Sequence, residues 1–147
     1  MVGSGDLRMA LPPWLVPFDT TETLFANQPL RPGGDGFLEL TAEGPRTLIP
    51  QPAPRESLEV WLERRIEPWG PGEGAARSVE LPAGSGVLIE RVLAPVPHAW
   101  RLAAYAIQTP VGVAYLLVDG PPESWMGHED DITLIPMLME LGPGRPT

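Results

Sequence analysis

Residues 100–118 read WRLAAYAIQTPVGVAYLLV, and this stretch decides the fold. Two apolar segments, 100–108 and 113–118, flank Thr109-Pro110-Val111-Gly112, where proline and glycine hold positions that suit a tight turn. We therefore expect an antiparallel hairpin closed by a three-residue turn with a bulge. The run 116–118 is continuously apolar, which predicts a strand in the middle of a sheet with both faces covered.

The rest of the chain supplies further short strands around this hairpin. Residues 78–81 and 87–93 are expected to form strands on either side of a turn at 82–86. Alternating apolar residues over 37–41 predict a half-buried strand after a glycine-rich turn. Extended segments are also expected over 11–18 and 23–25, the first confined to an edge or loop by its three prolines.

Two amphipathic helices are expected to pack on the sheet. In the first, 56–67, the apolar side chains fall on one arc and Pro68 ends the helix. The second runs from about 130 to 141, where Asp130, Asp131 or Thr133 can cap it. Pro136 fits without strain if Thr133 is the cap, and a helix that begins earlier should kink.

These elements predict an α+β fold, a single domain with an antiparallel β-sheet and helices packed on it. We assign the domain to residues 11–141, with a flexible N-terminus at 1–10 and a flexible tail at 142–147. A length of 147 residues with 43% hydrophobic side chains suits one domain with a core.

Composition limits the function more than it defines it. The net charge of −9 argues against a general nucleic-acid binder, and no apolar run is long enough to span a membrane. The absence of cysteine and lysine removes thiolate and Schiff-base chemistry.

The start of the chain lacks the features of a signal peptide, so we expect a cytoplasmic protein. Scarce amides, missing cysteine and frequent proline indicate a heat-adapted bacterium, and the absence of lysine points to GC-rich codon usage.

Two groups of residues carry a family resemblance. The first is Leu38-Glu39-Leu40 followed by the helix that contains 56–62; the second is Leu81-Pro82-Ala83-Gly84, the 100–118 hairpin and a closing helix with Ile132 and Ile135. This layout resembles the PsbP-like α/β/α sandwich over residues 11–141. That superfamily includes photosystem II extrinsic proteins, the Ran-binding nuclear import factor, DcrB-type bacterial proteins and Eag-type chaperones of type VI secretion. The resemblance implies binding rather than catalysis and assigns a role to no individual residue.

Tryptophan in loops favours interfaces, and Trp14, Trp69 and Trp125 all lie near the ends of elements. Trp125 and Met126, beside His128, form our candidate exposed recognition patch. Trp61 and Trp100 are expected in the core.

Arg65 falls within the apolar arc of the first helix, close to Trp69. It can stack on an indole, pair with a buried carboxylate or mark a ligand pocket. The alternative is that its stem covers apolar surface while its head reaches water.

The opposite arc of that helix carries four glutamates. A solvated face is the simplest interpretation, and docking of a basic partner is the alternative. The four residues are Glu56, Glu59, Glu63 and Glu67.

His128, Glu129 and Asp131, with Asp130 between them, are a weak candidate for a metal site; capping of a helix N-terminus is the competing interpretation. His98 can act as a general base, although a turn residue without a partner at a recognisable spacing suits a solvent-exposed side chain better. We identify no catalytic residues, and expect no cofactor.

We therefore expect a non-catalytic binding or accessory protein with a protein-interaction or chaperone-like role, acting on a protein partner or as a homodimer. No nucleic acid and no membrane insertion are expected. The alternative is an enzyme that binds a small molecule or metal in a pocket near His128 and Arg65.

Overall fold

The structure is a computed structural model that describes most of the chain. The described residues are 2–4, 7–19, 23–27, 38–45, 51–53, 55–70, 72, 74–93 and 99–141.

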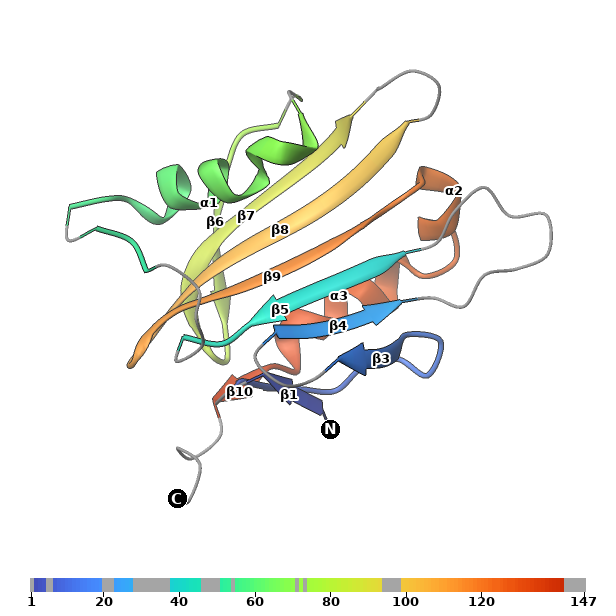
Figure 1. Cartoon of the computed structure of the whole chain (residues 1–147), viewed down its shortest axis with the longest axis horizontal. Coiled ribbons are helices and arrows are strands. Elements are labelled where there is room, and N and C mark those ends of the chain that lie inside the picture. Colours follow the sequence, from blue (N-terminus) through green and yellow to red (C-terminus); the bar gives the residue numbers. More distant parts are fainter. Residues whose placement is uncertain are drawn as a thin grey trace.

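A seven-stranded antiparallel sheet forms the centre of the molecule (Figure 1). In spatial order its strands are β3 (Val16–Asp19), β4 (Thr23–Asn27), β5 (Glu39–Glu43), β9 (Gly112–Gly120), β8 (Trp100–Thr109), β7 (Gly84–Leu93) and β6 (Arg77–Leu81). Every neighbouring pair is antiparallel, as expected from the sequence. A small second sheet contains β1 (Val2–Ser4), β2 (Leu7–Met9) and β10 (Glu140–Leu141).

The β8–β9 hairpin lies at the middle of the large sheet, with β9 as its central strand. All residues of β9 after Gly112 are buried, which confirms the prediction made from the apolar run at 116–118. Because side chains alternate between the faces of a strand, Leu116 and Val118 join one core cluster while Tyr115 and Leu117 join the other.

The expected three-residue turn with a bulge is wrong. Thr109 pairs directly with Gly112, so only Pro110 and Val111 lie in the loop. The Thr109 hydroxyl donates to the carbonyl of Gly112 at 2.6 Å and accepts from the amide of Val111 at 3.3 Å, which satisfies the turn without an extra residue. The expected five-residue turn at 82–86 is also shorter, because Leu81 pairs with Gly84.

One face of the sheet is covered by α1 (Leu58–Ile66), which is followed by a short 3₁₀ turn η1 (Glu67–Trp69) (Figure 1). The Ser57 hydroxyl accepts a hydrogen bond from the amide of Val60 and caps the helix. The face of α1 that was expected to be apolar packs on β7 and β8, and Trp61, Leu62 and Ile66 are buried there.

The opposite face of the sheet is covered by α2 (Pro122–Trp125) and α3 (Glu129–Met137), which lie behind it in Figure 1. Ile132, Ile135 and Met139 pack into the core cluster on this side, together with Leu7 and Met9 from the small sheet. Helices on both faces of an antiparallel sheet agree with the predicted α+β class. Within the described residues no helix is long and apolar enough to cross a membrane.

The second helix differs from the prediction at both ends. The residue at its N-cap is His128, whose side chain makes no capping bond, so none of Asp130, Asp131 and Thr133 is the cap. The helix runs through Pro136 and ends at Met137, and the amide of Leu138 still donates to the carbonyl of Leu134 at 3.0 Å. The chain then extends into β10, which pairs with β2.

The N-terminal segment also differs from the expected flexible start at 1–10. Residues 2–4 and 7–9 are hydrogen-bonded strands, and Leu7 and Met9 are fully buried. The alternation Leu7-Arg8-Met9 is the local signal for this strand. The boundaries at 11 and 141 stay predictions, and the tail at 142–147 lies outside the described residues.

Candidate functional site

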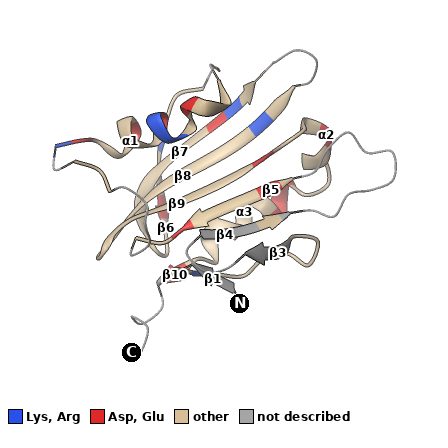
Figure 2. Cartoon of the chain, viewed as in Figure 1, with Lys and Arg blue, Asp and Glu red and all other residues tan. Residues whose placement is uncertain are grey.

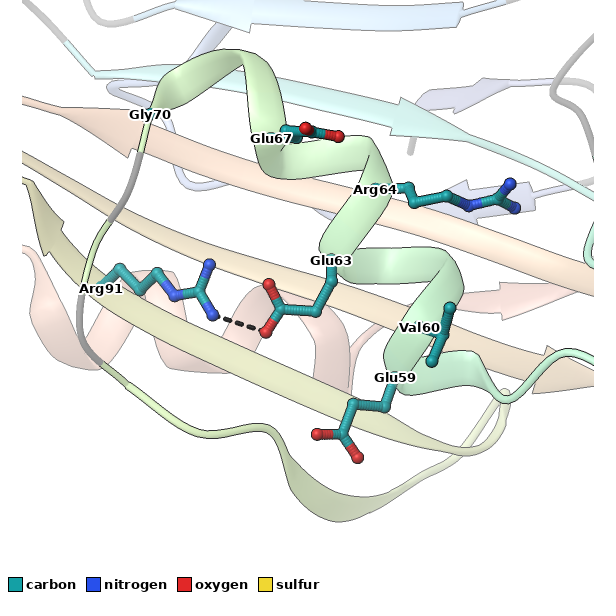
Figure 3. A pocket seen from close by; sticks show the side chains of 7 residues that line it. All are labelled: Glu59, Val60, Glu63, Arg64, Glu67, Gly70 and Arg91. Atoms are coloured by element: carbon teal, nitrogen blue, oxygen red, sulfur yellow. Dashed lines mark hydrogen bonds and ion pairs between the residues drawn. The ribbon is translucent and has the colours of Figure 1, made fainter.

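A groove runs along the outer side of α1 and reaches β7 (Figure 3). Its volume is about 580 Å³. It is lined by Glu59, Val60, Glu63, Arg64, Glu67, Gly70 and Arg91. Three of the four glutamates that the sequence placed on the polar arc of this helix therefore line one concave surface.

The two arginines of the groove are each engaged by a carboxylate. Arg91 Nη2 donates to Glu63 Oε1 at 2.5 Å and to the carbonyl of Gly74 at 3.2 Å, which ties β7 to α1. Arg64 Nη2 donates to Glu56 Oε1 at 2.5 Å. The positive charge of the groove is thus neutralised from within the protein.

Glu59 and Glu67 are different, because both are exposed and neither has an ion-pair partner among the described residues. They lie eight residues apart, which corresponds to about 12 Å along a helix axis. Val60, whose exposed fraction is 51%, adds an apolar contact beside Glu59. The arrangement can accept two cationic groups and one apolar contact, with the Glu63–Arg91 ion pair lying between the two carboxylates (Figure 3).

Arg65 points away from this groove and into the sheet. Its Nη2 donates to Glu43 Oε2 at 2.8 Å, and its guanidinium carbon lies 4.5 Å from the ring centre of Tyr115 and 5.5 Å from that of Trp61. Only 25% of the side chain is exposed. The structure therefore confirms that Arg65 pairs with a carboxylate and stacks on aromatic rings, and its head does not extend into water.

Trp69 contacts a buried carboxylate that the sequence analysis did not single out. The indole nitrogens of Trp69 and Trp100 both donate to Asp119 Oδ2, at 3.2 and 2.8 Å. Asp119 is 3% exposed, and Glu39 lies directly opposite it on β5. Burial raises the pKa of Asp119, against the two indole bonds that lower it, and burial together with the charge of Asp119 raises the pKa of Glu39.

Sequence reasoning missed this group because Trp69 and Asp119 are 50 positions apart. The signal available in the sequence was Asp119, an aspartate near the end of an otherwise apolar strand. A buried carboxylate in such a place needs hydrogen-bond donors from elsewhere in the fold. The donors to Asp119 come from the first residue of β8 and from the turn after α1, and together they fix that turn on the sheet.

The expected recognition patch at Trp125 and Met126 is wrong for its first member. Trp125 is 3% exposed, and the guanidinium of Arg101 covers its ring at 4.3 Å. The cation on β8 and the apolar core together bury the indole that was expected to be free. Met126 is 75% exposed, as the patch required.

The metal candidates are engaged by other side chains: two of them contact Trp14 and the third contacts Arg101. Glu129 accepts from Arg101, Asp131 accepts from the indole of Trp14 at 2.9 Å, and His128 stacks on Trp14 with the ring centres 4.0 Å apart. Among the described residues no group of three side chains of metal-binding type comes together.

His128 and Arg65 lie on opposite faces of the sheet, so no pocket contains both. Arg65 stacks on Tyr115, which belongs to the core on the α1 side; His128 stacks on Trp14, which packs against the core on the α3 side. His98 lies outside the described residues.

No known protein-family profile and no curated protein sequence matches this chain. Among solved structures it is similar to LpqN, described as involved in cell envelope biogenesis of Mycobacterium tuberculosis. The TM-score is 0.59, the sequence identity is 15%, and the match covers 96% of this chain and 86% of the LpqN chain. The chain is similar to LpqN in fold. At this identity the similarity carries no residue roles from one protein to the other.

Proposed function

We propose that this chain is a non-catalytic accessory protein that binds a basic segment of a partner protein in the groove along α1. The observation that carries the proposal is a pair of exposed carboxylates, Glu59 and Glu67, that have no ion-pair partner among the described residues and lie in a concave surface whose arginines are already neutralised. A cationic segment gains two ion pairs there without displacing an internal one.

The spacing of the two carboxylates selects the kind of segment. In an extended chain, side chains four residues apart are separated by about 13 Å, which is close to the rise of about 12 Å along the helix axis from Glu59 to Glu67. The segment that fits best is therefore extended, with Lys or Arg at i and i+4 and a small apolar residue nearby for Val60. The net charge of −9 favours the approach of such a segment.

Two finer assignments belong to the same proposal. The helices on both faces of an antiparallel sheet support membership of the PsbP-like superfamily, whose known members mainly bind other molecules. The fold shared with LpqN, which is described as involved in cell envelope biogenesis, supports a role in a process of that kind. Location in the cytoplasm and origin in a heat-adapted organism stay predictions.

Binding of a labelled extended peptide with arginines at i and i+4 tests the proposal by fluorescence anisotropy. The groove variant is Glu59→Gln with Glu67→Gln, and the matched control is Glu123→Gln with Glu140→Gln, two exposed carboxylates outside the groove. Because each exposed ion pair contributes roughly 0.5 kcal/mol, the groove variant should bind about fivefold more weakly. The control should stay within about twofold of the unmodified protein. An equal loss in both variants would show general attraction to an acidic surface and contradict the proposal.

A further inference from the structure

The outer face of α3 carries large apolar side chains that nothing in the described structure covers. Leu134, Met137 and Leu138 have exposed fractions of 50%, 45% and 50%. The inner face of the same helix is occupied by Ile132 and Ile135, which are buried. The exposed side chains are therefore surplus to the core.

The spacing of these three side chains places them on one ridge, in which Leu138 is the C-cap residue directly after α3. They are related by the i, i+3 and i+4 spacings, which place side chains next to each other on a helix. At about 100° per residue they fall within an arc of roughly 100°. Isolated apolar residues are normal on protein surfaces, but a contiguous group is typical of an interaction site.

The charge beside the ridge indicates what kind of surface can cover it. Asp130 lies one turn before Leu134 in the same row, is exposed, and has no ion-pair partner among the described residues. No basic side chain lies on α3. A net charge of −9 disfavours a second copy of this chain and an anionic membrane, and favours a basic partner.

We propose that this ridge docks an amphipathic helix of a partner protein, with leucine-type side chains at i, i+3 and i+4 on Leu134, Met137 and Leu138 and a Lys or Arg beside Asp130. Helix-on-helix contact fits because the ridge is a helix face whose side chains are spaced to interdigitate with those of a second helix. The ridge lies on the face of the sheet opposite the α1 groove, so this inference stands or fails independently of the proposed function. With both surfaces occupied, the protein would bridge two partner segments.

A synthetic 18-residue helical peptide, with leucines along one face and lysines elsewhere, is the probe. A second peptide carries glutamate in place of every lysine. The ridge variant is Leu134→Gln with Leu138→Gln; glutamine is a good helix former, and both sites are half exposed, so the fold should persist. The matched control is Val92→Gln with Val111→Gln, which removes two exposed apolar side chains elsewhere. Far-UV circular dichroism and the melting temperature verify that each variant is folded.

Burying the exposed half of one leucine contributes about fivefold in affinity, so the ridge variant should bind the lysine peptide on the order of 25-fold more weakly. The control should stay within about twofold, Asp130→Asn should lose roughly twofold to threefold, and the glutamate peptide should not bind. Equal binding by the ridge variant and the unmodified protein would overturn the proposal. Two other results would also overturn the proposal, in each case together with failure of the lysine peptide to bind. The first is self-association, measured by light scattering, that Leu134→Gln abolishes. The second is binding to anionic vesicles that Leu134→Gln abolishes.

Discussion

Replacing Arg65 by methionine is the most informative test of how α1 is held on the sheet. Methionine keeps much of the length and apolar stem of arginine but removes the guanidinium. The variant therefore loses the ion pair with Glu43 and the stacking on Tyr115 together. Both partners of the ion pair are mostly buried, with side-chain exposures of 25% and 16%, so solvent screens the pair only in part.

The magnitude follows from those two interactions. A well-formed, partly buried ion pair contributes about 1 to 2 kcal/mol, between the values for exposed pairs and for broken buried pairs. Cation–π stacking at a partly desolvated site adds roughly 1 kcal/mol. Arg65→Met should thus lower the free energy of unfolding by about 2.5 kcal/mol, which is a fall of about 7 °C in melting temperature for a domain of this size.

Urea unfolding, followed by tryptophan fluorescence at neutral pH, measures this loss. A double-mutant cycle with Glu43→Gln should give a coupling of about 1.5 kcal/mol, the part due to the ion pair. Arg65→Lys keeps the charge but loses the planar stack, so its loss should be roughly half as large. A change below about 0.5 kcal/mol in Arg65→Met would refute the reasoning, because a solvent-exposed head predicts that result.

Three further variants test other parts of the fold. Asp119→Asn keeps an acceptor for the indoles of Trp69 and Trp100 and removes a carboxyl whose pKa burial raises above its ordinary value of 3.8. The folded protein therefore holds this proton more tightly than the unfolded chain, and stability conferred at low pH is lost as the pH rises through the folded pKa. Urea unfolding from pH 3.5 upward should show the unmodified protein losing stability relative to the asparagine variant, and a pH-independent difference would contradict this. Gly86→Ala would place a Cβ 2.2 Å from the carbonyl oxygen of residue 106 on β8 and should destabilise the protein by about 2 kcal/mol, measured against Ser85→Ala; equal melting temperatures would show that the strands can separate there. The side chain of Gln51 accepts from the amide of residue 113 at 2.7 Å and donates to its carbonyl at 3.1 Å, as a neighbouring strand would. Gln51→Ala should therefore lower the free energy of unfolding by roughly 1 to 2 kcal/mol and speed hydrogen exchange at that amide. Unchanged exchange would show that Gln51 does not protect the amide.

Patterns with a short period predicted most of the elements. The helix at α1 follows from the spacing of Trp61, Leu62 and Ile66, and the antiparallel hairpin from apolar strands around a proline–glycine turn. Edge placement of β3 follows from its proline, since Pro17 has no amide to pair on a second side. In each case one local rule determined the structure.

Contacts between distant segments were beyond that kind of rule. The burial of Trp125 depends on Arg101, which lies on another element and 24 positions earlier in the chain. Asp131 and His128 form a plausible ligand pair in sequence, but Trp14 engages both. The end of α3 combines Pro136 with a strand partner from the start of the chain, which no local pattern reveals.

The groove was the part of the candidate site that sequence came closest to predicting. The glutamate stripe gave the charge of the surface, and Figure 2 shows that acidic and basic positions both occur along α1. The sequence did not show which of these glutamates form ion pairs within the protein. Arg91 comes from β7, 28 positions from Glu63, and only the fold shows that Glu63 is neutralised while Glu59 and Glu67 meet no cation in the described part of the chain.

Nuclear magnetic resonance titration of the ¹⁵N-labelled chain with the extended arginine peptide tests the central claim most directly. If the groove binds basic segments, the largest amide shifts will fall on residues 59–67 and on Arg91, and Glu59→Gln with Glu67→Gln will remove them. Shifts spread evenly over the acidic surface, or centred on 129–131 of α3, would contradict the claim.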